Sequence, residues 1–250
     1  MTFSDASVPN APIDSSAVSL VVGASGGVGE ALVAALQARG ETVWTWSRTG
    51  DSPVDITDEA SVSAAAALLQ AQLLADGRTL RRVLVATGVL HGQTADGQPM
   101  VPERSWRDMR PEALMQQFRT NALGPMLLLK HLLPLLPKRE PSWVACLSAR
   151  VGSVGDNRLG GWYSYRAAKA ALNQLVHTAA IELARSHPQA CCVVLHPGTV
   201  DTPLSRPFAK AGLQVRPPAV AAQELLAVLD ALSPAQTGLF FDHHGQPVPW

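Results

Sequence analysis

Short runs of apolar residues alternate along the chain with longer stretches in which apolar positions recur at helical spacing. The short runs predict six strands, at residues 18–22, 42–47, 82–87, 143–148, 190–196 and 239–242. The longer stretches predict helices at residues 29–39, 59–75, 111–136 and 162–186, the third of them kinked at Gly124 and Pro125. This alternation predicts an α/β fold, a doubly wound parallel sheet with helices on both faces.

The chain is long enough for one sizeable domain. It has 250 residues, of which 47% are apolar, and no repeat or linker divides it, so we expect a single domain over residues 18–250. Residues 1–17 are largely polar and contain proline, which predicts a flexible N-terminal tail. Residues 201–218 are rich in proline and polar side chains, and their length predicts a lid over a substrate site.

Charge and hydropathy argue against several kinds of partner. The 20 basic residues balance the 20 acidic ones, so no overall field attracts nucleic acid or an anionic membrane. The most apolar stretch, residues 126–136, is too short to cross a bilayer and is interrupted by a lysine, a histidine and a proline. The three cysteines lie in predicted strands as buried thiols, and a reduced, cytoplasmic setting is the default expectation.

A glycine-rich turn follows the first predicted strand and opens the first helix. It contains Gly23, Gly27 and Gly29, with Ser25 and Val28 between them. Glycine lets the backbone approach the pyrophosphate of a dinucleotide, whose charge lies at the helix N-terminus. The alternative is a tight turn without a ligand, but the position after the first strand favours the dinucleotide.

The end of the second strand indicates which dinucleotide binds. A carboxylate at this place would bind the ribose hydroxyls of NAD, but this chain has Ser47 and Arg48. A guanidinium can bind the 2′-phosphate of NADP, so the sequence favours NADP; the alternative is an arginine that is merely solvated. Asp55 either accepts a hydrogen bond from the adenine amino group or caps the next helix.

Tyr165 and Lys169 are four residues apart in a predicted helix, so their side chains share one face. A free phenol titrates near ~10, and a neighbouring ammonium group lowers that pKa. The pair therefore predicts acid–base chemistry, with the lysine beneath the phenol and a bound cofactor. Tyr163 has no lysine four residues further on, which argues against it.

Together with the glycine turn and the Tyr165–Lys169 pair, the segment Pro197-Gly198-Thr-Val200-Asp-Thr202 resembles the motifs of the short-chain dehydrogenase/reductase family. The similarity covers residues 18 to about 242, and the segment around Tyr165 is most similar to C-factor-like and carbonyl-reductase-like members. The resemblance implies a single Rossmann-like domain. It also implies that Tyr165 protonates a carbonyl oxygen as hydride arrives, while Lys169 holds the nicotinamide ribose and lowers the tyrosine pKa.

The same resemblance assigns roles to further residues. Asn121 matches the family asparagine whose backbone carbonyl binds a proton-relay water; the alternative is an asparagine at a simple helix kink. Gly88, after the third strand, lets the cofactor approach. Four residues match positions near the nicotinamide, the last two meeting its carboxamide: Pro197, Gly198, Val200 and Thr202.

The chain departs from the family pattern in two places. The third strand ends in Val85-Ala86-Thr87-Gly88, where the family has two asparagines, and Thr87 is a candidate to replace one of their hydrogen bonds. The substrate-binding serine of the family falls on Ala149. Ser148, if the strand has ended there, or Ser153 is then the candidate for this role, and Ser148 is favoured because it lies at the strand end.

The sequence therefore predicts an NADP(H)-dependent oxidoreductase that interconverts a small-molecule carbonyl compound and an alcohol. The alternative is a nucleotide-binding sensor or signalling protein of the same fold with little turnover, motivated by Ala86 and Ala149. Helices 111–136 and 162–186 resemble those through which family members pair, so a homodimer, or a homotetramer, is expected. No metal, nucleic-acid or membrane partner is predicted.

Overall fold

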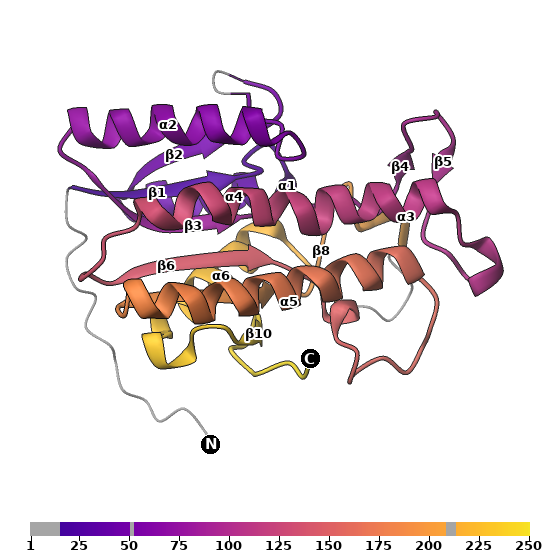
Figure 1. Ribbon diagram of the computed structural model, residues 1–250. Coiled ribbons are helices and arrows are strands. Elements are labelled where there is room, and N and C mark those ends of the chain that lie inside the picture. Colours follow the sequence, from indigo (N-terminus) through magenta and orange to yellow (C-terminus); the bar gives the residue numbers. More distant parts are fainter. Residues whose placement is uncertain (1–15, 51–52, 209–213) are drawn as a thin grey trace.

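A six-stranded parallel sheet forms the centre of the protein, and its strand order is β10-β7-β6-β3-β1-β2 (Figure 1). The computed structural model describes residues 16–50, 53–208 and 214–250. The strands are Ala17–Val22 (β1), Thr42–Trp46 (β2), Thr79–Val85 (β3), Ser142–Leu147 (β6), Ala190–His196 (β7) and Phe240–Asp242 (β10). The six predicted strands are confirmed, with ends that differ by at most three residues.

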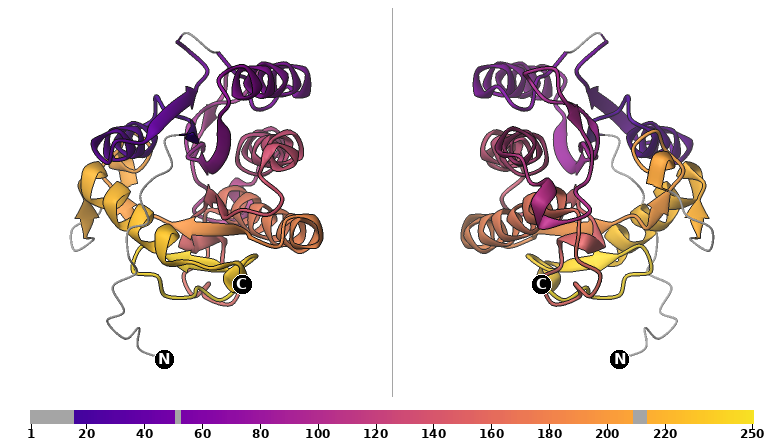
Figure 2. Two further views of the ribbon diagram at one scale, coloured as in Figure 1. Left: turned by 90° about the vertical axis from the view of Figure 1, so that its left-hand side faces the viewer. Right: turned by 90° about the vertical axis from the view of Figure 1, so that its right-hand side faces the viewer.

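Helices cover both faces of the sheet, as the alternating pattern predicts (Figure 2). On one face lie α1 (Gly27–Ala38) and α6 (Pro218–Ala231). On the other face lie α2 (Glu59–Ala75), α4 (Gly124–Leu132) and α5 (Tyr163–Ser186). Parallel strands are buried on both faces, which is why β7 reads as a continuous apolar run with six of its seven residues buried.

The direction of the connections changes between β1 and β3. The chain leaves β1 toward β2 on one side, and it leaves β3 toward β6 on the other. In an open parallel sheet, ligands bind at the carboxyl ends of the strands next to such a change. The glycine turn follows β1 and Gly88 follows β3, so the fold brings both to this place.

The predicted long helix 111–136 consists of four segments of differing helical type. They are α3 (Pro111–Phe118), a π-helical turn η2 (Arg119–Leu123), α4, and a short 3-10 turn η3 (Leu133–Leu135). The predicted kink is therefore a wide turn just before Gly124 and Pro125, where proline has no N–H to donate. The leucines that follow pack in the chain's own core.

The remaining elements are short and lie in the loops. They are β4 (Gly92–Gln93), β5 (Pro99–Met100), η1 (Trp106–Asp108), η4 (Arg150–Gly152), β8 (Thr199–Val200), η5 (Arg206–Phe208), β9 (Val215–Arg216) and η6 (Pro234–Gln236). The predicted lid contains η5 and β9, and β9 pairs in parallel with β8. Residues 209–213 of the lid and residues 1–15 of the predicted tail lie outside the described residues. None of the helices described here is both long and apolar enough to span a membrane.

Candidate active site

The glycine turn after β1 leaves little space for side chains, and at Gly23 its backbone is also left-handed. Gly23 has φ +86°, and a Cβ placed on it would lie 2.9 Å from the backbone of Ala86. A Cβ on Gly29 would lie 2.1 Å from the carbonyl oxygen of Gly23. A Cβ on Gly27 would lie 2.8 Å from Cγ2 of Thr202. The turn therefore lies against the end of β3 and the segment after β7. At its three glycine positions the space is too small for a larger side chain.

This turn fits the phosphates of a dinucleotide. The N-cap residue of α1 is Gly26, and no side chain caps the helix. Ser25 is exposed beside it and Val28 is half-buried. The first backbone N–H groups of the helix are thus left to an anionic ligand, which the helix dipole favours.

The residues that the sequence assigns to the adenosine end lie together after β2. Ser47 forms an isolated bridge with Pro53, and Arg48 is exposed beside it. The carboxylate of Asp55 accepts hydrogen bonds from the N–H and the hydroxyl of Thr57, both at 2.8 Å. These two bonds lower the pKa of Asp55, and Arg48 adds to the effect. The N-cap of α2 is Asp58, not Asp55.

Tyr165 and Lys169 lie on the first turns of α5, and both side chains are buried. Nζ of Lys169 lies 5.9 Å from the centre of the Tyr165 ring. Burial raises the pKa of Tyr165 well above its ordinary value. Burial lowers the pKa of Lys169 to about 8. For the phenol this direction is opposite to the lowering that the sequence suggested, because desolvation of the buried side chain disfavours the charged phenolate.

The Lys169 side chain ends among groups from three other elements. Nζ donates a hydrogen bond to the carbonyl of Leu147 at the end of β6, at 2.9 Å. A Cβ on Gly88 would lie 3.7 Å from Nζ and 3.3 Å from Oδ1 of Asn121. Gly152 packs against the Lys169 backbone so closely that a Cβ there would lie 2.8 Å from the lysine Cβ. The structure thus brings together four residues that the sequence singled out: Gly88, Asn121, Tyr165 and Lys169.

Asn121 lies in the π-helical turn and is fully buried. Its side-chain amide donates to the carbonyl of Val89 at 2.8 Å, and its side-chain oxygen accepts from the Val89 N–H at 3.0 Å. It also donates to Gln117. Asn121 therefore ties the loop after β3 to the helix; the role of its backbone carbonyl stays a prediction.

The two candidate serines both have partners inside the protein. Strand β6 ends at Leu147, so the condition that the strand ends before Ser148 is met. The Ser148 hydroxyl donates to Oδ1 of Asn173 on α5 at 2.7 Å. The Ser153 hydroxyl accepts from the backbone N–H of Asp156 at 3.1 Å. Which of them, if either, serves the substrate stays a prediction.

The segment after β7 contacts the glycine turn. Gly198 has φ +75°, and a Cβ there would lie 2.9 Å from Cδ of Arg216, so only glycine fits this turn after Pro197. Val200 and Thr202 are buried. The Thr202 contact with Gly27 links this segment to the glycine turn. Thr87, in contrast, replaces no lost hydrogen bond: its hydroxyl is buried and has no partner in the described structure.

Glu103 and Trp162 are two residues of the site that the motifs do not predict. The backbone N–H and the hydroxyl of Ser164 both donate to the Glu103 carboxylate, the first at 3.2 Å. Trp162 contacts the ring of Tyr165. Trp162 could be suspected from its closeness to Tyr165 in the sequence, but Glu103 lies in a loop without periodicity. In the described ranges no group of three or more histidine, cysteine, aspartate or glutamate side chains could hold a metal ion.

Comparisons with known proteins show the family of this chain. The family model described as short chain dehydrogenase matches residues 17–212. The chain belongs to the short-chain dehydrogenase family. A 1-hydroxy-2-glutathionyl-2-methyl-3-butene dehydrogenase from Rhodococcus sp. is 30% identical over 92% of this chain and 98% of that protein. The C-signal of Myxococcus xanthus is 37% identical over 55% of this chain and 78% of that protein.

Solved structures have the same fold. An NADPH-bound carbonyl reductase from chicken fatty liver superposes with a TM-score of 0.79 over 94% of both chains, at 24% identity, which shows likeness of fold. A short-chain dehydrogenase/reductase from Burkholderia multivorans with bound NADP has a TM-score of 0.76 at 26% identity, over 95% of this chain and all of the other. The predicted Rossmann-like fold and family are thus confirmed.

Proposed function

We propose that this protein is an NADP(H)-dependent oxidoreductase that interconverts an aldehyde or ketone with the corresponding alcohol. The observation that carries the proposal is the meeting of Tyr165, Lys169, Gly88 and Asn121 at the carboxyl end of the sheet, next to the glycine turn. This is where an open parallel sheet binds a dinucleotide.

The residues present fit a dinucleotide phosphate. The glycine turn would hold the pyrophosphate, and Ser47 and Arg48 would hold the 2′-phosphate, with Asp55 at the adenine. Gly88, Lys169, Pro197, Gly198, Val200 and Thr202 would hold the nicotinamide half. When bound, NADPH supplies the hydride for the reduction. Two of the solved relatives bind NADPH or NADP, which supports this choice of cofactor.

The proton comes from Tyr165. The phenol is protonated at neutral pH, as an ordinary phenol with a pKa near ~10 is, and burial raises the pKa further. The protonated phenol is the form that an acid needs when a carbonyl is reduced. An alkoxide is far more basic than a phenolate, so proton transfer to the developing alcohol oxygen is favourable. Lys169, with a pKa of about 8, carries a proton on much of its population at neutral pH and stabilises the phenolate that remains.

Replacing Tyr165 tests the proposal. In a Tyr165→Phe variant we expect NADPH oxidation with a panel of aldehydes and ketones to fall by about 10²–10⁴-fold, because the general acid is lost. NADPH affinity, followed by the fluorescence of the bound nucleotide, should stay within about twofold. Equal turnover by the variant and the parent would refute Tyr165 as the acid.

A second candidate function is a nucleotide-binding sensor or signalling protein. Two observations favour it: Ala149 stands at the family's serine position, and both neighbouring serine hydroxyls have partners inside the protein. One relative is named C-signal. Tight NADPH binding by the parent protein, with no Tyr165-dependent turnover on any carbonyl of the panel, would favour this alternative.

We also propose that the protein forms a homodimer, with a homotetramer as the alternative. The proposal rests on the likeness of α4 and α5 to the helices through which family members pair. Ile181, on α5, is about half exposed (48%) in the single chain. Light scattering should give a mass near twice the 26.5 kDa of one chain; a mass of one chain would exclude both assemblies.

A further inference from the structure

Three successive residues before α5 have left-handed backbone conformations. Gly160 and Gly161 have φ +64° and +65°, which glycine adopts readily, but Trp162 has φ +56°. Among the described residues Trp162 is the only non-glycine residue with a positive φ. A bulky side chain is rarely found there because its Cβ crowds the following carbonyl oxygen. Such strain persists only where other contacts maintain it.

Glu103 supplies one set of these contacts. Its backbone carbonyl accepts a hydrogen bond from the Trp162 N–H at 2.6 Å. Its carboxylate accepts the N–H and hydroxyl of Ser164, the second residue of α5. Glu103 is buried and has no ion-pair partner among the described residues, so the positive end of the helix dipole is what offsets its charge. Trp162 cannot cap α5 itself, and Glu103 does so from a distant loop.

Arg166 supplies a second set from the other side. Its guanidinium donates to the carbonyls of Gly160 and Gly161, at 3.2 and 2.9 Å, and to that of Val151 at 3.2 Å. The turn before α5 is therefore held at its N–H groups by Glu103 and at its carbonyls by Arg166. Residues held from both sides keep one conformation.

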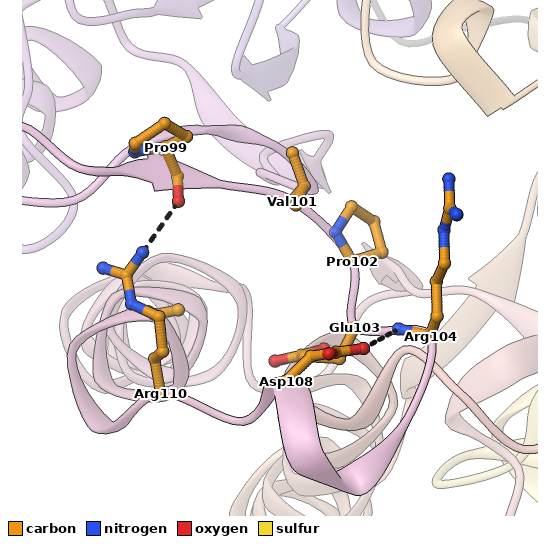
Figure 3. Close-up of a pocket in the computed structure, with 8 residues that line it drawn as sticks. Pro99, Val101, Pro102, Glu103, Arg104, Asp108 and Arg110 are labelled. Atoms are coloured by element: carbon orange, nitrogen blue, oxygen red, sulfur yellow. Dashed lines mark hydrogen bonds between the residues drawn. The ribbon is translucent and has the colours of Figure 1, made fainter.

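The loop that carries Glu103 is itself anchored, as Figure 3 shows. Glu103 and Asp108 lie in one wall of a cavity of about 380 Å³, and Arg110 lies across from Arg104. The Asp108 carboxylate accepts from the Arg104 N–H at 3.1 Å, and Arg110 donates to the carbonyl of Pro99 at 3.0 Å. These contacts fix the backbone on either side of Glu103.

The effect of this arrangement is to place the Trp162 ring beside the proposed general acid. The ring lies edge-on to that of Tyr165, with centres 6.2 Å apart, and to that of Phe208, 5.4 Å apart. Phe208 in turn lies 5.6 Å from His91, whose Nε2 is 3.1 Å from the carbonyl oxygen of Pro203. Three rings from three distant segments thus form a continuous aromatic wall: His91, Trp162 and Phe208.

Two arginines, in η4 and η5, form ion pairs with acidic side chains, and Arg166 donates to backbone carbonyls. Arg150 forms an ion pair with Asp156 at 2.6 Å, and Arg206 forms one with Asp201 at 3.1 Å. The rings form an apolar surface beside Tyr165, and a flat aromatic group packs well on such rings in offset or edge-on arrangements.

We infer that Trp162, held in its left-handed conformation by Glu103, is a specificity-determining residue that selects carbonyl compounds in which the carbonyl is attached to an aromatic ring. The inference rests on the proposed carbonyl reduction and names its substrate class. Glu103 acts through Trp162 and is a positioning residue.

The test compares two aldehydes of equal carbon number, benzaldehyde and cyclohexanecarboxaldehyde, with NADPH. Their kcat/KM ratio is measured for the parent protein and for each variant, so that the intrinsic reactivities of the aldehydes cancel. We expect Trp162→Leu to lower the benzaldehyde preference about tenfold, and Trp162→Phe, which keeps a ring, to lower it by less than about threefold. The matched control Trp106→Leu changes an exposed tryptophan and should leave the ratio unchanged.

A second variant covers the case in which Trp162→Leu does not fold. Phe208→Leu removes the ring that Trp162 contacts and should also lower the preference for benzaldehyde. An unchanged ratio in a folded Trp162→Leu or Phe208→Leu protein that still turns over would overturn the aromatic wall and leave the proposed reduction standing. If the parent reduces neither aldehyde nor any other carbonyl, the proposed function fails and this inference fails with it.

Glu103→Gln tests the positioning role. The amide keeps the shape of the side chain but loses the charge and one acceptor for Ser164. Because the Glu103 backbone carbonyl still accepts from the Trp162 N–H, we expect the benzaldehyde preference to fall by less than in Trp162→Leu. Thermal stability should change little more than in the control Glu182→Gln on the exposed face of α5. A purely structural role would lower stability and slow both aldehydes equally. That outcome would overturn the assignment of Glu103.

Discussion

Individual side chains in this site have properties that burial sets more strongly than neighbouring charge does. Tyr165 and Lys169 are one helical turn apart, yet the pKa of the phenol is raised, because its side chain is buried. The same desolvation lowers the pKa of Lys169 to about 8. Both directions follow from the cost of holding charge in an apolar setting. A phenol is in its acid form at neutral pH with or without this shift, so the role of Lys169 in the proposed reduction is to stabilise the phenolate left after proton transfer.

Arg48 should determine the choice between the two nicotinamide cofactors. Its exposed guanidinium stands where a carboxylate would favour NAD. A charge-assisted hydrogen bond contributes about 1.5–3 kcal/mol, so Arg48→Ala should weaken NADPH relative to NADH by roughly ten- to a hundredfold. Parallel kcat/KM measurements with both cofactors check this. The control is Arg107→Ala, an exposed arginine that stacks on Trp106; equal kinetics of the parent with NADPH and NADH would contradict the assignment.

The two serines can be separated by single replacements. If Ser148 or Ser153 donates to the developing alkoxide, its alanine variant should lose about 10²–10³ in kcat. Loss of a structural hydrogen bond alone would instead lower stability by about 1 kcal/mol and leave kcat nearly unchanged. Kinetics and thermal melting of both variants distinguish these effects. If neither change slows turnover, the serine role is vacant in this chain.

Among the elements, the turn between β1 and α1 has the strictest requirements. Its glycines lie against backbone atoms of the turn itself and of Ala86, so the turn is shaped by what it packs against as well as by its ligand. The π-helical turn before α4 is a second specialised element, because it places the Asn121 amide against Val89. Single-turn π segments are frequent at functional sites.

A methyl group at position 29 should damage both the fold and cofactor binding. In Gly29→Ala the new Cβ would lie 2.1 Å from the Gly23 carbonyl oxygen, so the backbone must move. We expect a destabilisation of at least about 2 kcal/mol, a fall in Tm of roughly 4–8 °C, and NADPH binding at least about tenfold weaker, since the phosphate cradle is distorted.

The control for this change is Gly77→Ala. Gly77 has φ +61°, but no atom lies within 4 Å of the new Cβ. The left-handed backbone alone should cost about 1 kcal/mol and leave NADPH affinity unchanged. Normal NADPH binding by Gly29→Ala, measured by nucleotide fluorescence, would show that this turn does not hold the phosphates.

At the scale of the whole molecule, an ionic network that is buried at Arg82 and Glu41 ties helix α6 to the sheet. Arg82 in β3 forms ion pairs with Glu41, just before β2, and with Asp230 near the end of α6. The Ser19 hydroxyl of β1 donates to the same Glu41 carboxylate at 2.6 Å. Because the network joins β1, β3 and α6, it couples segments that the chain order keeps far apart.

Two adjacent arginines of β3 allow a matched test of this network. Arg82→Met leaves the carboxylate of Glu41, whose side chain is only 6% exposed, without its cation, and should destabilise the protein by about 3–5 kcal/mol. Arg81→Met breaks a pair with Glu140, which is 56% exposed, and should cost no more than about 1 kcal/mol. Chemical denaturation compares them; equal losses would show that burial of the network is not what matters.

The sequence by itself determined the strands, the helices, the glycine turn and the Tyr165–Lys169 pair. Each depends on short-range spacing, in which the backbone geometry of a strand or helix decides which side chains share a face. The ordered motifs were also enough to identify the family. Even the kink before Pro125 was predictable, although its form as a π-helical turn was not.

Only the tertiary structure decided which distant residues contact these parts and how burial shifts their pKa values. Glu103 and Ser164 are 61 positions apart, and the contacts of Trp162 with Phe208 depend on loops without periodicity. The pKa of Tyr165 depends on the burial of its side chain, and the missing partner of Thr87 on the packing at the end of β3. Such properties arise from contacts between segments distant in the chain, and local spacing contains no record of those contacts.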